Sequence, residues 1–210
     1  MRPVRAYNML VILTDEARRL NLAAKVERGL PPLILMTDTV RLADPSAAAR
    51  ALPRGSAIIL RHYDDPRRAS VAHSLAALCR QRGLIFLVAG DPVLAAAVQA
   101  DGLHLPAHLV GRLGWRRRRP GWLVTAAAHS PAGLFAAAEA GADAAILAPV
   151  FASPSRQSPI LGPLRFAALA GASALPIYAL GGVTARGARR LGRSGAVGVA
   201  GVGGFGAGAD

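Results

Sequence analysis

The chain has 210 residues, of which 52% are hydrophobic and only 5% aromatic, so we expect one domain with an aliphatic, alanine-rich core. The formal net charge is +13, and Lys25 is the only lysine among the 25 basic side chains. No apolar run reaches the ~18 residues that a membrane-spanning helix needs, no signal peptide is recognisable, and the single Cys79 excludes a disulfide framework. We therefore expect a cytoplasmic protein with no membrane partner and a buried, inert thiol.

The arginine excess is more typical of a GC-rich coding sequence than of selected phosphate contacts. Arginines cluster once, at 116–119 between two tryptophans, and we interpret this run as a solvated connection rather than an anionic-ligand patch. No zinc-finger, RNP or basic-helix motif accompanies it, so we expect no nucleic-acid partner.

In chain order, the first expected element is a helix at about 15–28, with Thr14 as its N-cap and acidic residues in its first turn. Gly29 and two prolines end it. Strands and alanine-rich helices then alternate, with helices at 66–81, 92–99, 130–140 and 184–193. The strands are apolar on both faces, which is typical of a parallel sheet covered by crossover helices. We expect eight strands, at 33–36, 57–61, 84–88, 102–105, 123–126, 144–147, 176–180 and 197–202.

Eight such strands predict a compact α/β (β/α)₈ TIM barrel. We expect a single domain over 1–210, with an N-terminal extension at 1–31 and the barrel at 32–205. Little or no helix is expected after the eighth strand, and the N-terminal helix is expected to fill part of that gap.

Two glycine pairs follow the seventh and eighth strands: Gly181 with Gly182, and Gly203 with Gly204. In TIM barrels the loops after these strands often bind phosphate, and glycine lets backbone N–H groups approach an anion closely. The alternative is that the glycine-rich end is a floppy tail.

Motifs at the strand ends, in this order and spacing, resemble those of the thiamine phosphate synthase and TenI-type thiazole tautomerase barrels. The resemblance covers roughly residues 33–205 and includes Met36-Thr37-Asp38, Gly90-Asp91, Asp101-Gly102-Leu103-His104-Leu105, His129-Ser130 and Ala179-Leu180-Gly181-Gly182-Val183. It implies the same barrel and a place in thiamine biosynthesis.

The departures from the synthases concern their pyrimidine pyrophosphate site. The synthases carry Gln-x-Arg-x-Lys on strand two, of which only Arg61 remains here. They bind Mg²⁺ through two aspartates, and only Asp91 matches one. Their Thr-x-Thr-Lys phosphate loop is altered here to Ser153, Ser155 and Arg156 with Pro154 between the serines. The resemblance therefore implies a retained thiazole phosphate site and is closer to the tautomerases, whose acid/base histidine matches His129.

His129 follows the fifth strand, and histidine is the residue type best suited to take and return a proton near neutral pH. Its alternative role is to satisfy the loop before Ser130, a good N-cap. Arg61 ends the second strand and either binds a phosphate or carboxylate of the substrate or forms a salt bridge. Asp91 is either a weak metal ligand or, slightly favoured, a helix cap.

His104 is included as a substrate-binding candidate, although a structural role is favoured because it alternates with Leu103 and Leu105. His62 and His108 are placed near the same rim and expected to be solvent-exposed.

Three functions remain open: a tautomerase-like isomerase that binds a small phosphorylated thiazole, a thiamine phosphate synthase with an altered pyrimidine site, and a catalytically silent phosphate-binding protein. We expect no required cofactor, with Mg²⁺ used only if synthase activity is retained. A homo-oligomer is compatible with the sequence.

Overall fold

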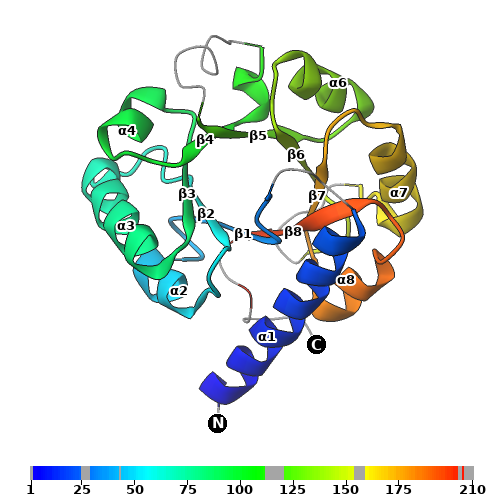
Figure 1. Cartoon of the computed structure of the whole chain (residues 1–210), viewed down its shortest axis with the longest axis horizontal. Coiled ribbons are helices and arrows are strands. Elements are labelled where there is room, and N and C mark those ends of the chain that lie inside the picture. Colours follow the sequence, from blue (N-terminus) through cyan, green and yellow to red (C-terminus); the bar gives the residue numbers. More distant parts are fainter. Residues whose placement is uncertain are drawn as a thin grey trace.

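The computed structural model describes residues 2–24, 29–42, 44–111, 121–153, 159–202 and 205. Eight parallel strands form a closed barrel in which each strand pairs with its neighbours in sequence and β8 pairs with β1 (Figure 1). The strands are β1 (Leu33–Met36), β2 (Ala57–Leu60), β3 (Ile85–Ala89), β4 (Gly102–Leu105), β5 (Leu123–Ala128), β6 (Ala144–Leu147), β7 (Ile177–Leu180) and β8 (Ala196–Val202). The predicted (β/α)₈ barrel is therefore confirmed.

Helices surround the strands, as Figure 1 shows. They are α2 (Pro45–Ala51), α3 (Arg68–Arg82), α4 (Pro92–Ala97), α6 (Pro131–Glu139), α7 (Gly162–Ala172) and α8 (Ala185–Arg190), with a short 3₁₀ helix at Ala107–Leu109. Four of them begin at a side chain that accepts a backbone N–H of the first turn, which satisfies a donor that the helix leaves unpaired. These caps are Asp44, Asp91, Ser130 and Thr184.

The core has two layers, separated by the strands. Residues such as Leu35, Leu60 and Leu103 point outward and pack against the helices, whereas Ile34 and Ile59 point into the barrel. This division follows from the two-residue alternation of side chains along a strand. Cys79 lies in the outer layer, so its predicted burial is confirmed, and this burial raises its pKa to about 12.

The N-terminal helix is longer than predicted. Helix α1 (Arg2–Ala23) begins well before residue 15, and Thr14 is not its N-cap. Thr14 lies inside the helix, where its hydroxyl donates to the carbonyl of Leu10 at 2.7 Å. A hydroxyl side chain followed by acidic residues is typical of a helix N-terminus, which is why the sequence predicts a start at Thr14. Leu10 and Leu13, however, are buried and belong to the same apolar helix face, so the helix extends upstream of Thr14.

Helix α1 packs against β8 and α8, the position that the prediction assigned to it (Figure 1). Asn21 Nδ2 donates to the carbonyls of Leu30 at 3.1 Å and Val197 at 2.8 Å. Buried Glu16 accepts the Arg189 Nε hydrogen at 2.9 Å, which ties α1 to α8. Among the residues that the structure describes, no helix is both long and apolar enough to cross a membrane.

Replacing Asn21 by Ala should destabilise the barrel by about 1–3 kcal/mol, because two carbonyls lose their donor. Alanine is a good helix former, so helix propensity does not explain the loss. The measurement is chemical denaturation, with Leu22→Ala as the matched control because Leu22 is 78% exposed on the same helix. Equal stabilities of the two variants would contradict a bridging role for Asn21.

Candidate functional site at the C-terminal rim of the barrel

Most of the predicted site residues meet at one end of the barrel. Arg61, Asp91, His129 and Ser153 follow β2, β3, β5 and β6, and the Gly181-Gly182 pair follows β7. All strands are parallel, so their C-terminal ends form a single rim, which is where TIM-barrel enzymes keep their reacting groups. Four predicted phosphate-binding residues, Ser155, Arg156, Gly203 and Gly204, lie outside the described residues, as does the arginine run at 116–119.

His129 is exposed at this rim. Its Nδ1 lies 2.9 Å from the carbonyl oxygen of Ala148, at the end of β6. A carbonyl only accepts, so Nδ1 carries the hydrogen and the neutral ring holds its lone pair on Nε2. The next residue, Ser130, caps α6 by accepting the Gly133 N–H at 3.1 Å. The helix is thus capped by Ser130, and the imidazole is oriented with Nε2 as a base.

His104 is placed differently, inside the barrel. It is only 2% exposed, and its Nδ1 lies 2.9 Å from Thr125 Oγ1 on the neighbouring strand β5. Burial, with a smaller contribution from the Arg61 guanidinium, lowers the pKa of His104 to about 3. His104 is therefore neutral at physiological pH, as the favoured structural role requires, and it lies below the rim rather than on it.

The Gly181-Gly182 pair allows the β7 loop to pack against the β6 loop. Both residues have positive φ, at +99° and +60°. A Cβ at Gly182 would lie 2.1 Å from the carbonyl oxygen of Ala152, and the Gly181 carbonyl accepts the Phe151 N–H at 2.9 Å. A larger side chain at Gly182 would displace this loop, so the glycine has a packing reason in addition to the predicted contact with an anion.

Arg61 lines a pocket of about 500 Å³ beyond the ends of β1 and β2, together with residues that include Thr37, Asp38, Tyr63 and Arg67. Its backbone N–H donates to buried Thr37 Oγ1 at 2.9 Å, which fixes the chain where it leaves β2. Burial raises the pKa of the Asp38 carboxyl, but hydrogen bonds from the backbone N–H groups of Arg41 and Val40 lower it by more. The pKa of Asp38 therefore lies below its usual value.

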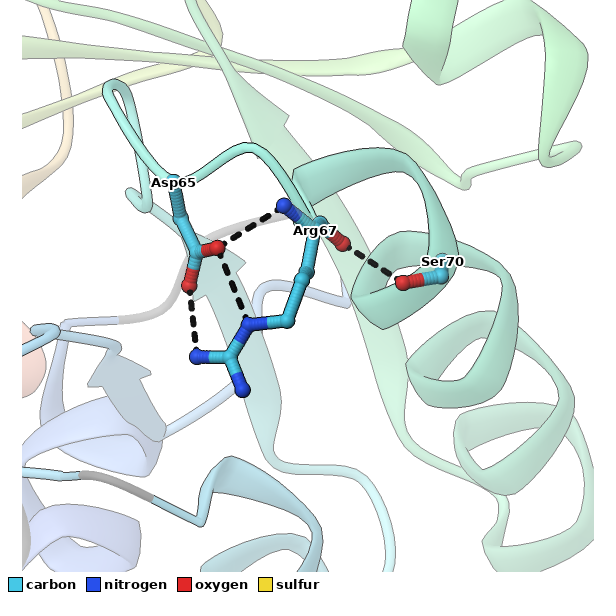
Figure 2. Close-up of polar contacts among 3 residues, drawn as sticks. All are labelled: Asp65, Arg67 and Ser70. Carbon is cyan, nitrogen blue, oxygen red and sulfur yellow. Dashed lines mark hydrogen bonds and ion pairs between the residues drawn. The ribbon is translucent and has the colours of Figure 1, made fainter.

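The salt-bridge alternative for Arg61 is not observed within the described residues. Asp65 instead binds Arg67 through both carboxylate oxygens, each 3.2 Å from a guanidinium nitrogen, as Figure 2 shows. Asp38 accepts the N–H groups of Val40 and Arg41.

His62 was expected to be solvent-exposed, and this expectation is wrong. It is 4% exposed, and neither ring nitrogen has a hydrogen-bond partner. Burial lowers the pKa of His62, opposed by the charges of Asp65 and Asp38. The alternation of side chains along a strand explains this placement. Ile59 points into the barrel and Leu60 points outward, so His62, two residues after Leu60, is directed toward the outer layer beneath the helices. His108 is exposed, as expected.

Asp91 caps α4, because its Oδ1 accepts the Leu94 N–H at 2.9 Å. The segment after β4 brings Pro106, Ala107 and His108 rather than a second carboxylate. Within the described part of the chain, no group of three His, Cys, Asp or Glu side chains is placed to hold a metal ion. These residues do not fit a dedicated Mg²⁺ site, which needs several oxygen ligands.

Sequence reasoning missed two residues of this rim. Arg68 begins α3, and its guanidinium carbon lies 5.4 Å from the centre of the Tyr63 ring. The sequence placed Arg68 only within the expected helix at 66–81, and it gave Tyr63 no role in the site. Their position directly after the second strand was the available signal, since helices that follow a strand begin at the rim.

The comparisons with known proteins agree with this architecture. The model of the TMP-TENI family, described as thiamine monophosphate synthase, matches residues 33–205. A thiamine-phosphate synthase of Acidithiobacillus ferrooxidans is 34% identical over 175 residues, covering 76% of this chain and 79% of its own. One of Thioalkalivibrio sulfidiphilus is 32% identical over 154 residues, covering 68% and 71%.

A solved structure described as thiamine phosphate pyrophosphorylase from Pyrococcus furiosus superposes on this chain with a TM-score of 0.70. It is 24% identical in sequence, and the match covers 87% of this chain and 88% of its own. This likeness supports the fold. The protein is thus a (β/α)₈ barrel with its candidate site at the C-terminal rim. It belongs to the thiamine monophosphate synthase family, which confirms the resemblance drawn from its motifs.

The stability of the protein should fall as the pH is lowered from about 6.5 toward 3, in part because of His104. Its pKa is lowered to about 3 in the folded state, so between these pH values the unfolded chain binds the additional proton. Replacing His104 by Gln should reduce the slope of unfolding free energy against pH by about 1.4 kcal/mol per pH unit in this window.

The measurement is denaturant unfolding at several pH values, with His73→Gln as the control. His73 is an exposed histidine of α3. A His104→Gln protein with the same acid dependence as the parent would show that His104 is not the buried neutral group described above.

Proposed function

We propose that this protein is an enzyme of thiamine biosynthesis that binds a small phosphorylated thiazole and catalyses its tautomerisation. The observation that carries the proposal is the orientation of His129, whose Nδ1 is held by the Ala148 carbonyl while the exposed ring presents Nε2 at the rim. A group in this state is suited to remove a proton from one carbon and return it to another.

The substrate phosphate is proposed to bind on the β7–β8 side of the rim. The loop after β7 supplies backbone N–H groups at Gly181 and Gly182, and Ser153 lies half-buried on the adjoining β6 segment. Anchoring the phosphate there positions the ring over the mouth of the barrel, and positioning is a large part of enzymatic rate enhancement. Proton transfer between carbons needs no metal, so we propose that no cofactor is required.

A thiamine phosphate synthase is the second candidate. The comparisons favour it, because the curated relatives described above carry that name. The pocket at Arg61 also retains one of the three polar residues of the synthases' strand-two pattern. That reaction joins the thiazole to a pyrimidine and releases pyrophosphate, and we propose Mg²⁺ as its cofactor only if the substrate's own phosphates supply most of the ligands.

His129→Asn should lower isomerase turnover by about 10²- to 10⁴-fold, which is the usual contribution of a positioned general acid/base. Affinity for a thiazole phosphate should stay nearly unchanged, because the proposed phosphate site lies on other loops. Turnover is followed by steady-state kinetics and affinity by ligand-dependent thermal stabilisation.

The matched control is His73→Asn, since the Nδ1 of that exposed histidine also contacts a backbone carbonyl, Ala69 O, at 2.9 Å. Equal turnover in the His129 and His73 variants would eliminate His129 as the acid/base. Absence of isomerase activity in the parent protein would favour the silent phosphate-binding protein.

Synthase activity is tested by expressing the protein in a strain that lacks thiamine phosphate synthase. We expect weak or absent growth without thiamine, because the glutamine and lysine of the strand-two pattern are replaced here by Ile59 and Tyr63. Those side chains would otherwise stabilise the charged leaving group. Robust growth would make the synthase the preferred function.

A further inference from the structure

The first turns of helix α1 lie outside the barrel. Figure 1 shows this helix crossing the ring of outer helices, with its N-terminal end well beyond the ring. The helix packs mainly on β8 and α8, and Leu10 is the first buried residue among its described side chains. Helices in proteins gain most of their stability from tertiary packing rather than from helix propensity. The projecting turns of α1 therefore lack the packing that the barrel gives to the rest of the helix.

Residues 9–13 of α1 are a run of five apolar side chains, Met-Leu-Val-Ile-Leu. Successive residues of a helix are rotated by about 100°, so five in a row cover its whole circumference. The barrel covers one side, where Leu10 and Leu13 are buried, whereas Met9, Val11 and Ile12 are 36%, 42% and 42% exposed. A helix that is apolar all round is one that is buried all round. We call these three exposed residues the α1 patch, and we expect a second surface to cover it.

Charges of opposite sign stand on either side of the α1 patch. Arg5 lies four residues before Met9, and Asp15 lies four residues after Val11, so each position is one helical turn from the patch. The Asp15 side chain is 57% exposed, and its ion pair with Arg18 is long, at 3.7 Å. Such a surface pair contributes little to stability, so Asp15 is available to a cation of another molecule.

This arrangement is self-complementary. When two α1 helices pack antiparallel with Met9 of one copy beside Val11 of the other, position 5 of each copy comes beside position 15 of the other. A two-fold axis thus makes the same favourable contact twice. A parallel pair would instead place like charges together. An anionic lipid surface would repel Asp15, and a partner of one charge sign would leave either Arg5 or Asp15 unmatched.

We propose that the α1 patch is the surface through which two copies of this chain form a dimer, with their α1 helices antiparallel and Arg5 of each copy paired with Asp15 of the other. The surface precedes residues 33–205, where the family model matches, so it is a feature of this chain outside the matched region. It involves no residue of the rim and does not depend on the proposed isomerase activity.

The test is sedimentation equilibrium of the full chain, whose monomer mass is 21.6 kDa. The parent protein should sediment at twice this mass at micromolar concentration. Combining Val11→Gln with Ile12→Gln should give the monomer mass, because association would then bury amide groups without partners. Glutamine is a good helix former, so α1 itself should be retained.

Leu22→Gln is the matched control, because it adds the same amide to the same helix. Leu22 is 78% exposed, and it lies about 16 Å along the helix axis from Val11. This variant should therefore sediment as the parent does. A monomeric Leu22→Gln protein would contradict the location of the interface at the α1 patch.

Charge reversal tests the antiparallel arrangement. Asp15→Arg and Arg5→Asp should each weaken dimerisation by at least about tenfold, because each change creates two like-charge contacts across the two-fold axis. Combining the two changes should restore the dimer, since the exchanged charges attract again. Positions 5 and 15 are about 15 Å apart along one helix, so pairing within a single chain would not explain the rescue. Thermal melting of each variant checks that the barrel is folded.

Three results would overturn the proposal: a monomeric parent protein, a dimer that persists in the Val11 and Ile12 double variant, or a charge-exchanged protein that associates no better than the single variants. A monomeric parent that sediments with vesicles of anionic lipid would assign the α1 patch to a membrane surface instead. None of these measurements uses a thiazole compound, so a failure of the isomerase proposal leaves them unaffected.

Discussion

Closure of the barrel between β1 and β8 is the constraint on which the rest of the structure depends. Leu33 to Met36 pair with Val199 to Val202, and the carbonyl of Pro32 accepts the Val199 N–H at 3.0 Å. The approach is close enough to require glycine, because a Cβ at Gly198 would lie 2.4 Å from the Pro32 oxygen. Tyr178 stabilises the same seam from inside, donating its hydroxyl to the Pro31 carbonyl at 2.7 Å.

Closure removes the open edges of the sheet and brings all eight strand ends into one ring. Residues far apart in sequence, such as Arg61 and His129, are brought to the same rim by this geometry alone. Helix α1 contributes at the seam, where Asn21 donates to carbonyls on both sides of the β1–β8 junction. Helix α1 therefore supports closure of the barrel at the N-terminal ends of β1 and β8, whereas the candidate site lies at the C-terminal ends of the strands.

The two histidines on adjacent strands show how depth in the barrel determines chemistry. His104 on β4 lies inside, where burial lowers its pKa to about 3 and keeps it neutral. His129 lies beyond the end of β5, with one nitrogen fixed by a carbonyl and the ring exposed. The first is suited to fill a polar position within an apolar layer next to Thr125, and the second to exchange protons.

The sequence by itself determined the barrel, because eight apolar segments at regular spacing between helices have few other ways to be buried. It also determined the capping roles of Asp91 and Ser130, which depend on residues only three positions away. Helix α1 begins earlier in the sequence than the local start signal at Thr14 predicts, because the buried face at Leu10 and Leu13 continues the helix upstream. Tertiary structure alone decided that His62 is buried without a partner and that Arg68 returns to the mouth over Tyr63. Those outcomes depend on how a loop turns after its strand and on which neighbouring strand ends beside it, and local sequence patterns do not encode such long-range packing.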